Sequence, residues 1–186
     1  MSAIATFDTD LFLFLNGLHA DWLDSIMVFI SRNAVSIVFY LAFMVLAMFK
    51  YGKKSLWILL GMAVVVLLSD QMSAHVIKPW VQRPRPCHNP DISQLVHLPS
   101  GHCGGTYGFV SSHAANCFAC AVFFGRLLKP FVRWIKLPLY IWAVVVSYSR
   151  IYLGVHYPLD IACGTALGIL IGLAAEKAVT RIIRKT

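Results

Sequence analysis

The sequence predicts an all-α membrane protein, a multi-pass helix bundle with five or six transmembrane helices. Of its 186 residues, 59% are hydrophobic and only 13% are charged, and the mean hydropathy is +0.71. A soluble domain has about 25% charged residues, so the composition excludes a disordered chain, a coiled coil and a conventional soluble enzyme. The length fits one domain, residues 1–186.

The first element, residues 1–33, is expected to form one or two amphipathic helices in the outer membrane interface. Apolar residues recur there at helical spacing. Charged residues interrupt the segment too often for a clean span: Asp8, Asp10, Asp21, Asp24 and Arg32. The segment also lacks the basic n-region of a cleavable signal peptide. A sixth, weakly apolar span near residues 10–31 is the alternative.

Five later segments have the apolar character of spanning helices, which need about 20 residues each. They are residues 34–50, 55–77, 111–128, 137–153 and 157–176. The first is slightly short but strongly apolar. Pro158 stands in the first turn of the last helix, where proline is tolerated. Residues 87–110 are expected to form an outer loop.

Clusters of Lys and Arg orient these helices. Eleven of the sixteen basic residues fall in segments 50–54, 126–136 and 177–185, which share one side if every predicted segment spans. The positive-inside bias assigns that side to the cytoplasm. The same bias accounts for the net charge of +8, so the expected partner is the lipid bilayer and not nucleic acid.

Lys78, Arg85 and Arg150 go against this bias, because they stand at the outer ends of predicted spans. Ionisable residues at a membrane boundary indicate a functional site, and the planar arginine fork matches phosphate oxygens. Three separated cations at one depth therefore predict an anion site. Arg83, taken alone, is interpreted as a headgroup anchor that snorkels to the surface.

These cations belong to three spaced motifs. The motifs are Lys78-x6-Arg85-Pro86, Ser111-Ser112-His113 and Ser149-Arg150-x5-His156-x3-Asp160. Together they resemble the type 2 phosphatidic acid phosphatase (PAP2) superfamily, which is itself similar to vanadium haloperoxidases. The resemblance covers residues 78–160 and implies a PAP2/haloperoxidase-like helical core. Val110 and Ser112 depart from the family's Pro-Ser-Gly-His in the second motif.

A literal Pro-Ser-Gly-His also occurs at residues 99–102, but it is rejected as the working motif. The glycine-rich sequence after His102 cannot start a helix, whereas the sequence after His113 can. The motif needs a helix N-terminus, where free backbone N–H groups bind anions. Ser111 also suits an N-cap. The sequence therefore favours His113.

The resemblance implies a role for each residue of these motifs. His156 is the nucleophile and forms a phosphohistidine, while Asp160, one helical turn later, orients it. His113 protonates the leaving oxygen. The phosphate-binding residues are Lys78, Arg85, Ser111, Ser112 and Arg150. Because three cations supply the charge that a metal otherwise would, neither a metal nor another cofactor is expected.

The predicted function is hydrolysis of a membrane lipid phosphate or diphosphate at the outer, periplasmic side of a bacterial cytoplasmic (inner) membrane. Phosphatidylglycerol phosphate, undecaprenyl diphosphate and lipid A are the substrate types that the resemblance implies. The small size and the second motif also resemble small bacterial members, including lipid A phosphatases. One alternative is a vanadate-dependent haloperoxidase-like enzyme, which five spans disfavour because those relatives are soluble. The other is a non-catalytic anion-binding or transport protein.

Cys87 and Cys103 bracket the outer loop. A location outside the cytoplasm permits a disulfide, and this pair is the predicted bridge. A metal site formed with the loop histidines is the alternative, but the spacing is not a recognised zinc pattern.

Overall fold

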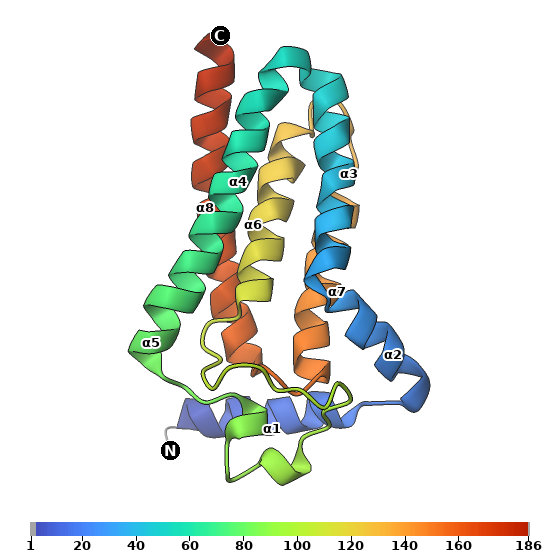
Figure 1. The fold of residues 1–186 in the computed structure, drawn as a ribbon, viewed down its shortest axis with the longest axis vertical. Coiled ribbons are helices and arrows are strands. Elements are labelled where there is room, and N and C mark those ends of the chain that lie inside the picture. Colours follow the sequence, from blue (N-terminus) through green and yellow to red (C-terminus); the bar gives the residue numbers. More distant parts are fainter. Residues whose placement is uncertain (1–2, 186) are drawn as a thin grey trace.

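The computed structural model describes residues 3–185 as an all-helical bundle with one helix lying across its end (Figure 1). The helices in chain order are α1 (Ala3–Gly17), α2 (Asp21–Ile30), α3 (Asn33–Tyr51), α4 (Ser55–Gln71), α5 (Lys78–Val81), α6 (Ser112–Leu127), α7 (Lys136–Tyr152) and α8 (Pro158–Lys185). A π-helical segment, Met72–Ile77, joins α4 to α5. The prediction of an all-α fold is confirmed.

Within residues 3–185, two helical stretches are long and apolar enough to cross a membrane. They are Asn33–Val81, in which α3 and α4 run in opposite directions, and Pro158–Lys185. Helices α1 and α2 meet that test only as a pair, and the pair is bent by 114°. The chain is therefore a membrane protein with helical spans, and no single straight helix covers residues 10–31.

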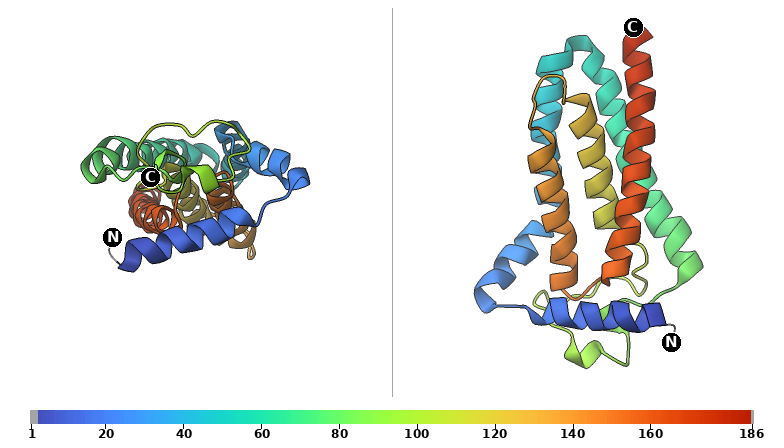
Figure 2. Two further views of the ribbon diagram at one scale, coloured as in Figure 1. Left: turned by 90° about the horizontal axis from the view of Figure 1, so that it is seen from below. Right: turned by 180° about the vertical axis from the view of Figure 1, so that it is seen from behind.

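The basic clusters of the sequence gather at one end of the bundle. Lys54 Nζ donates a hydrogen bond to the carbonyl of Ile183 at 2.9 Å, and Arg126 Nε lies 2.7 Å from Glu176 Oε2. Helix α1 lies across the opposite end, beneath α7 and α8 (Figure 2). The two ends of the molecule thus differ in charge.

Helix α6 is the centre of the bundle, and α8 packs closely along it. Glycines four residues apart on α8 make this approach possible. A Cβ atom at Gly168 would lie 2.3 Å from the carbonyl oxygen of Ala115, and one at Gly164 would lie 2.6 Å from that of Ser111. The backbone N–H of Ser111 also donates to the carbonyl of Asp160 at 3.0 Å. The start of α6 is therefore held against the first turn of α8.

We expect Gly168→Leu to force α6 and α8 apart. Overpacking usually costs about 1–3 kcal/mol, and here the obstacle is backbone, which cannot rotate away. The measurement is thermal unfolding of the detergent-solubilised protein. Gly17→Leu is the matched control, because a Cβ atom there meets nothing within 4 Å. Equal stability of Gly168→Leu and the wild type would contradict the close packing.

Candidate active site

The residues singled out in the sequence gather at the end of the bundle that α1 covers. Each stands at a helix end or in a connection between helices, so short segments from distant parts of the chain meet there. The set comprises Lys78 in α5, Arg85 after it, Ser111, Ser112 and His113 at the start of α6, Arg150 in α7, His156 after α7, and Asp160 in α8.

The start of α6 carries the second motif. Ser111 is the N-cap, and its hydroxyl accepts a hydrogen bond from the backbone N–H of Ala114 at 3.4 Å. The expected helix start at this position is confirmed. Residues 99–102 lie instead in a loop, where His102 is exposed.

His156 and Asp160 form a buried pair. His156 Nδ1 lies 3.3 Å from Asp160 Oδ2, and that oxygen also accepts the backbone N–H of Tyr157 at 3.0 Å. The other ring nitrogen, Nε2, lies 3.5 Å from Arg85 Nη1. A proton on Nδ1 is held by the carboxylate, which leaves the lone pair of Nε2 directed at the cations.

The surroundings of His156 keep its ring neutral. Burial lowers the pKa of His156 well below its usual value, and the charges of Arg85, Arg150 and Lys78 lower it further. A backbone hydrogen bond with Gly108 acts in the opposite direction but is the smallest of these effects. A neutral imidazole is the form that can attack a phosphorus atom.

The three cations reach this centre from different elements. Lys78 Nζ donates to Ser112 Oγ at 2.8 Å, Arg85 Nη1 donates to the carbonyl of Val155 at 3.4 Å, and Arg150 donates to Ser31 Oγ. The buried Nε atoms of Arg85 and Arg150 have no hydrogen-bond partner among residues 3–185. Unpaired buried donors are costly, and an anion would satisfy them.

Ser73 was not singled out by the sequence, yet it contacts the second motif. Its hydroxyl donates to Ser112 Oγ at 2.8 Å, so Ser73 and Lys78 share one acceptor. The two residues are five apart within and just after the π-helical segment, whose turn relates residues i and i+5. No sequence pattern predicted the π-helical segment.

Arg83 is not a headgroup anchor, and that interpretation is wrong. Its Nη1 lies 3.0 Å from Asp160 Oδ1 and its Nη2 lies 2.7 Å from Asp8 Oδ2. Its guanidinium also stacks 3.9 Å from the ring centroid of Tyr157. The side chain points inward because two carboxylates and an aromatic face hold it there.

The outer loop closes against this centre. Cys87 and Cys103 are joined by a disulfide, with their Cα atoms 6.0 Å apart. The N–H of Arg85 donates to the carbonyl of Thr106 at 3.0 Å, and the N–H of Gly108 donates to that of Arg83 at 2.9 Å. A Cβ atom at Gly108 would lie 3.1 Å from Asp160 Oδ2. The backbone of Gly108 in this loop therefore lies close to the His156–Asp160 pair.

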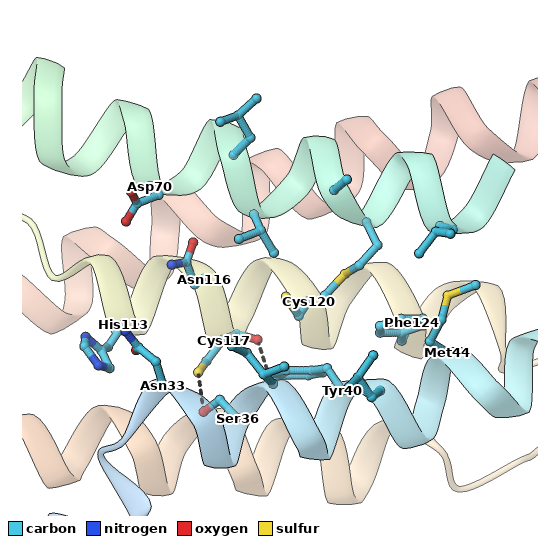
Figure 3. A pocket seen from close by; sticks show the side chains of 17 residues that line it. Asn33, Ser36, Tyr40, Met44, Asp70, His113, Asn116, Cys117, Cys120 and Phe124 are labelled. Atoms are coloured by element: carbon cyan, nitrogen blue, oxygen red, sulfur yellow. Dashed lines mark hydrogen bonds between the residues drawn. The ribbon is translucent and has the colours of Figure 1, made fainter. Parts of the chain in front are cut away.

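A largely apolar cavity of about 630 Å³ lies between α3, α4 and α6, and His113 is the one residue of the three motifs that lines it. Figure 3 shows His113, Asp70 and Asn116 at one end, and Met44 and Phe124 at the other. Polar side chains thus line the end beside the proposed reaction centre, and apolar ones line the end toward the basic clusters.

Comparison with known proteins gives consistent matches. The family model described as the PAP2 superfamily matches residues 54–184. A lipid A 4'-phosphatase of Porphyromonas gingivalis is 37% identical over 92% of this chain and 72% of that protein. A lipid A 4'-phosphatase of Bacteroides thetaiotaomicron is 34% identical over 89% of this chain and 73% of that protein.

A solved structure shares the fold. It is the transmembrane PAP2-type phosphatidylglycerolphosphate phosphatase of Bacillus subtilis, with a TM-score of 0.72 and 23% identity. The match covers 98% of this chain and 89% of that one.

Proposed function

Because this chain belongs to the PAP2 superfamily and is a membrane lipid phosphatase, we propose that it cleaves its substrate through a phosphohistidine at His156. The observation that carries this proposal is the orientation of the ring. Asp160 occupies Nδ1, and Nε2 faces Arg85. That arrangement presents a lone pair to a phosphate held by cations.

In the first step His156 Nε2 bonds to phosphorus and the bond from phosphorus to the leaving oxygen breaks. His113, in the first turn of α6, gives its proton to that oxygen. Lys78, Arg85 and Arg150 offset the charge on the phosphoryl oxygens, with Ser111, Ser112 and the start of α6 beside them. In the second step water attacks phosphorus, His113 takes the proton, and inorganic phosphate leaves His156.

The substrate we propose is a lipid A-type phosphate. Two relatives that match most of this chain are named lipid A 4'-phosphatases. The cavity beside His113 supports a lipid, because an acyl chain would lie among its apolar residues while the phosphate stays with the cations. A soluble phosphate ester would leave that cavity unused.

We also propose that five helices cross the membrane and that the reaction centre faces the periplasm. The basic end of the bundle would face the cytoplasm. Helices α1 and α2 would lie in the outer interface, where their exposed apolar side chains, including Phe7 and Trp22, meet lipid.

The test is phosphate release by the purified protein in mixed micelles. The panel contains lipid A, phosphatidylglycerol phosphate and undecaprenyl diphosphate. We expect phosphate release from all three lipids to require His156. We also expect kcat/KM to be highest for lipid A. A higher kcat/KM for either of the other lipids would overturn the substrate assignment. Anion binding without phosphate release would support the transport alternative, and halide oxidation with vanadate and peroxide would support the haloperoxidase alternative.

A further inference from the structure

Four side chains form a continuous chain of contacts from α1 to the proposed nucleophile. Asp8 in α1 contacts Arg83, Arg83 contacts Asp160, and Asp160 contacts His156, at 2.7, 3.0 and 3.3 Å respectively. Asp8 lies outside the three motifs, and Arg83 stands at one of the unspecified positions of the first motif.

We propose that Arg83 and Asp8 are positioning residues for His156, and that helix α1 is thereby a working part of the reaction centre. Arg83 sets the orientation of the Asp160 carboxylate, and Asp8 sets that of Arg83. This inference rests on the proposed role of His156.

The carboxylate of Asp160 has little freedom while Arg83 is present. Oδ2 accepts from Tyr157 N–H and pairs with His156 Nδ1, and Oδ1 accepts from Arg83. The side chain is fully buried. Without Arg83, Oδ1 would be a buried acceptor lacking its charged donor, and the group would rotate or take up a proton to compensate. Either change would release the imidazole of His156.

Asp8 ties this arrangement to the helix that carries Asp160. Its Oδ1 accepts the backbone N–H of Leu159 at 2.8 Å, one of the free donors in the first turn of α8. Its Oδ2 holds Arg83. A carboxylate is also favourable at a helix N-terminus. The buried Asp8 side chain thus holds both the first turn of α8 and the Arg83 side chain.

Arg83 differs in this respect from the proposed phosphate-binding arginines. Both of its Nη atoms are taken by carboxylates, whereas Arg85 and Arg150 keep buried Nε atoms without a partner among residues 3–185. Arg83 also stacks on Tyr157, the residue next to the nucleophile. Its contacts are with the support of His156 and not with the phosphate site.

The first experiment separates positioning from substrate binding. We expect Arg83→Gln to lower kcat by about 10- to 100-fold, by analogy with the loss that follows removal of a group that orients a metal-bound histidine, while KM stays near the wild-type value. Asp8→Asn should lower kcat less, because the asparagine keeps an acceptor for the N–H of Leu159 and loses only the negative charge that pairs with Arg83. Arg83→Lys should restore part of the activity. A rise in KM with unchanged kcat would overturn the proposal.

Arg126→Gln is the matched control. It breaks an arginine–carboxylate pair, Arg126 with Glu176, at the other end of the bundle, and the 2.7 Å distance in that pair equals the one between Arg83 and Asp8. Its kcat should equal that of the wild type. If Arg126→Gln lowers kcat as much as Arg83→Gln does, the effect is a general loss of structure and the positioning role is wrong.

The second experiment combines variants with Asp160→Asn. If Arg83 acts through Asp160, Arg83→Gln should cost little more in this background, because the effects of coupled residues do not multiply. If Arg83→Gln lowers kcat in the Asp160→Asn background by the same factor as in the wild type, the proposal is overturned. The two hypotheses fail separately. A fully active His156→Ala variant would refute the proposed nucleophile, whereas an inactive His156→Ala beside wild-type kcat in Arg83→Gln and Asp8→Asn would refute this inference alone.

Discussion

His156→Ala is expected to abolish phosphate release from every substrate, with a loss of the order of 10⁶-fold, as follows removal of a covalent nucleophile in other hydrolases. The reason is that no leaving group, however good, replaces a missing nucleophile. The measurement is turnover of a lipid phosphate and of an aryl phosphate with an activated leaving group. The wild type, quenched without acid, should also carry labelled phosphate in an acid-labile, base-stable bond.

His102→Ala is the matched control for this variant, because His102 belongs to the literal Pro-Ser-Gly-His but is exposed in the outer loop. It should keep most of the activity and still trap labelled phosphate. Trapping in His156→Ala at the wild-type level would place the nucleophile elsewhere.

His113→Ala is expected to lower turnover of the lipid substrate by roughly 100- to 10,000-fold, the usual contribution of general acid–base catalysis. A lipid alkoxide is a poor leaving group and needs the proton that His113 supplies. An activated aryl phosphate needs none, so the loss in the first step should be much smaller with it. The measurement is the burst of leaving group in a rapid-mixing experiment.

The comparison of the two histidines tests their assignment. Rescue by the activated substrate is expected for His113→Ala and not for His156→Ala. Equal rescue of both variants would mean that the two roles are assigned wrongly. An inactive His102→Ala beside an active His113→Ala would move the second motif to residues 99–102.

Two local features of the candidate site were predictable from the sequence, because they depend on spacing along short segments. Residues 156 and 160 are one helical turn apart, and the structure pairs their side chains at 3.3 Å. Ser111 precedes a run that can start a helix, and the structure makes it the N-cap of α6. The positions of α3, α4, α6, α7 and the start of α8 followed in the same way from apolar runs whose length a bilayer sets.

The environment of the Arg83 side chain could not be predicted from the sequence. A single arginine at a membrane boundary fits a snorkelling anchor and a buried ion pair equally well, since the local sequence is the same in both. Its partners, Asp8 and Asp160, lie 75 and 77 residues away in the chain. Asp8 itself was visible only as an acid that interrupts an apolar segment.

The sequence by itself determined the main helices and the family motifs, and it predicted a helix start just before His113, because each of these depends on local periodicity or on residues a few positions apart. Three features were decided by the tertiary structure alone. The Asp8 carboxylate of α1 is buried, and a π-helical segment brings Ser73 and Lys78 to the hydroxyl of Ser112. The backbone of Gly108 lies against Asp160. Those features depend on how close separate helices and loops can approach one another. Close packing of this kind is also seen where the glycines of α8 meet α6.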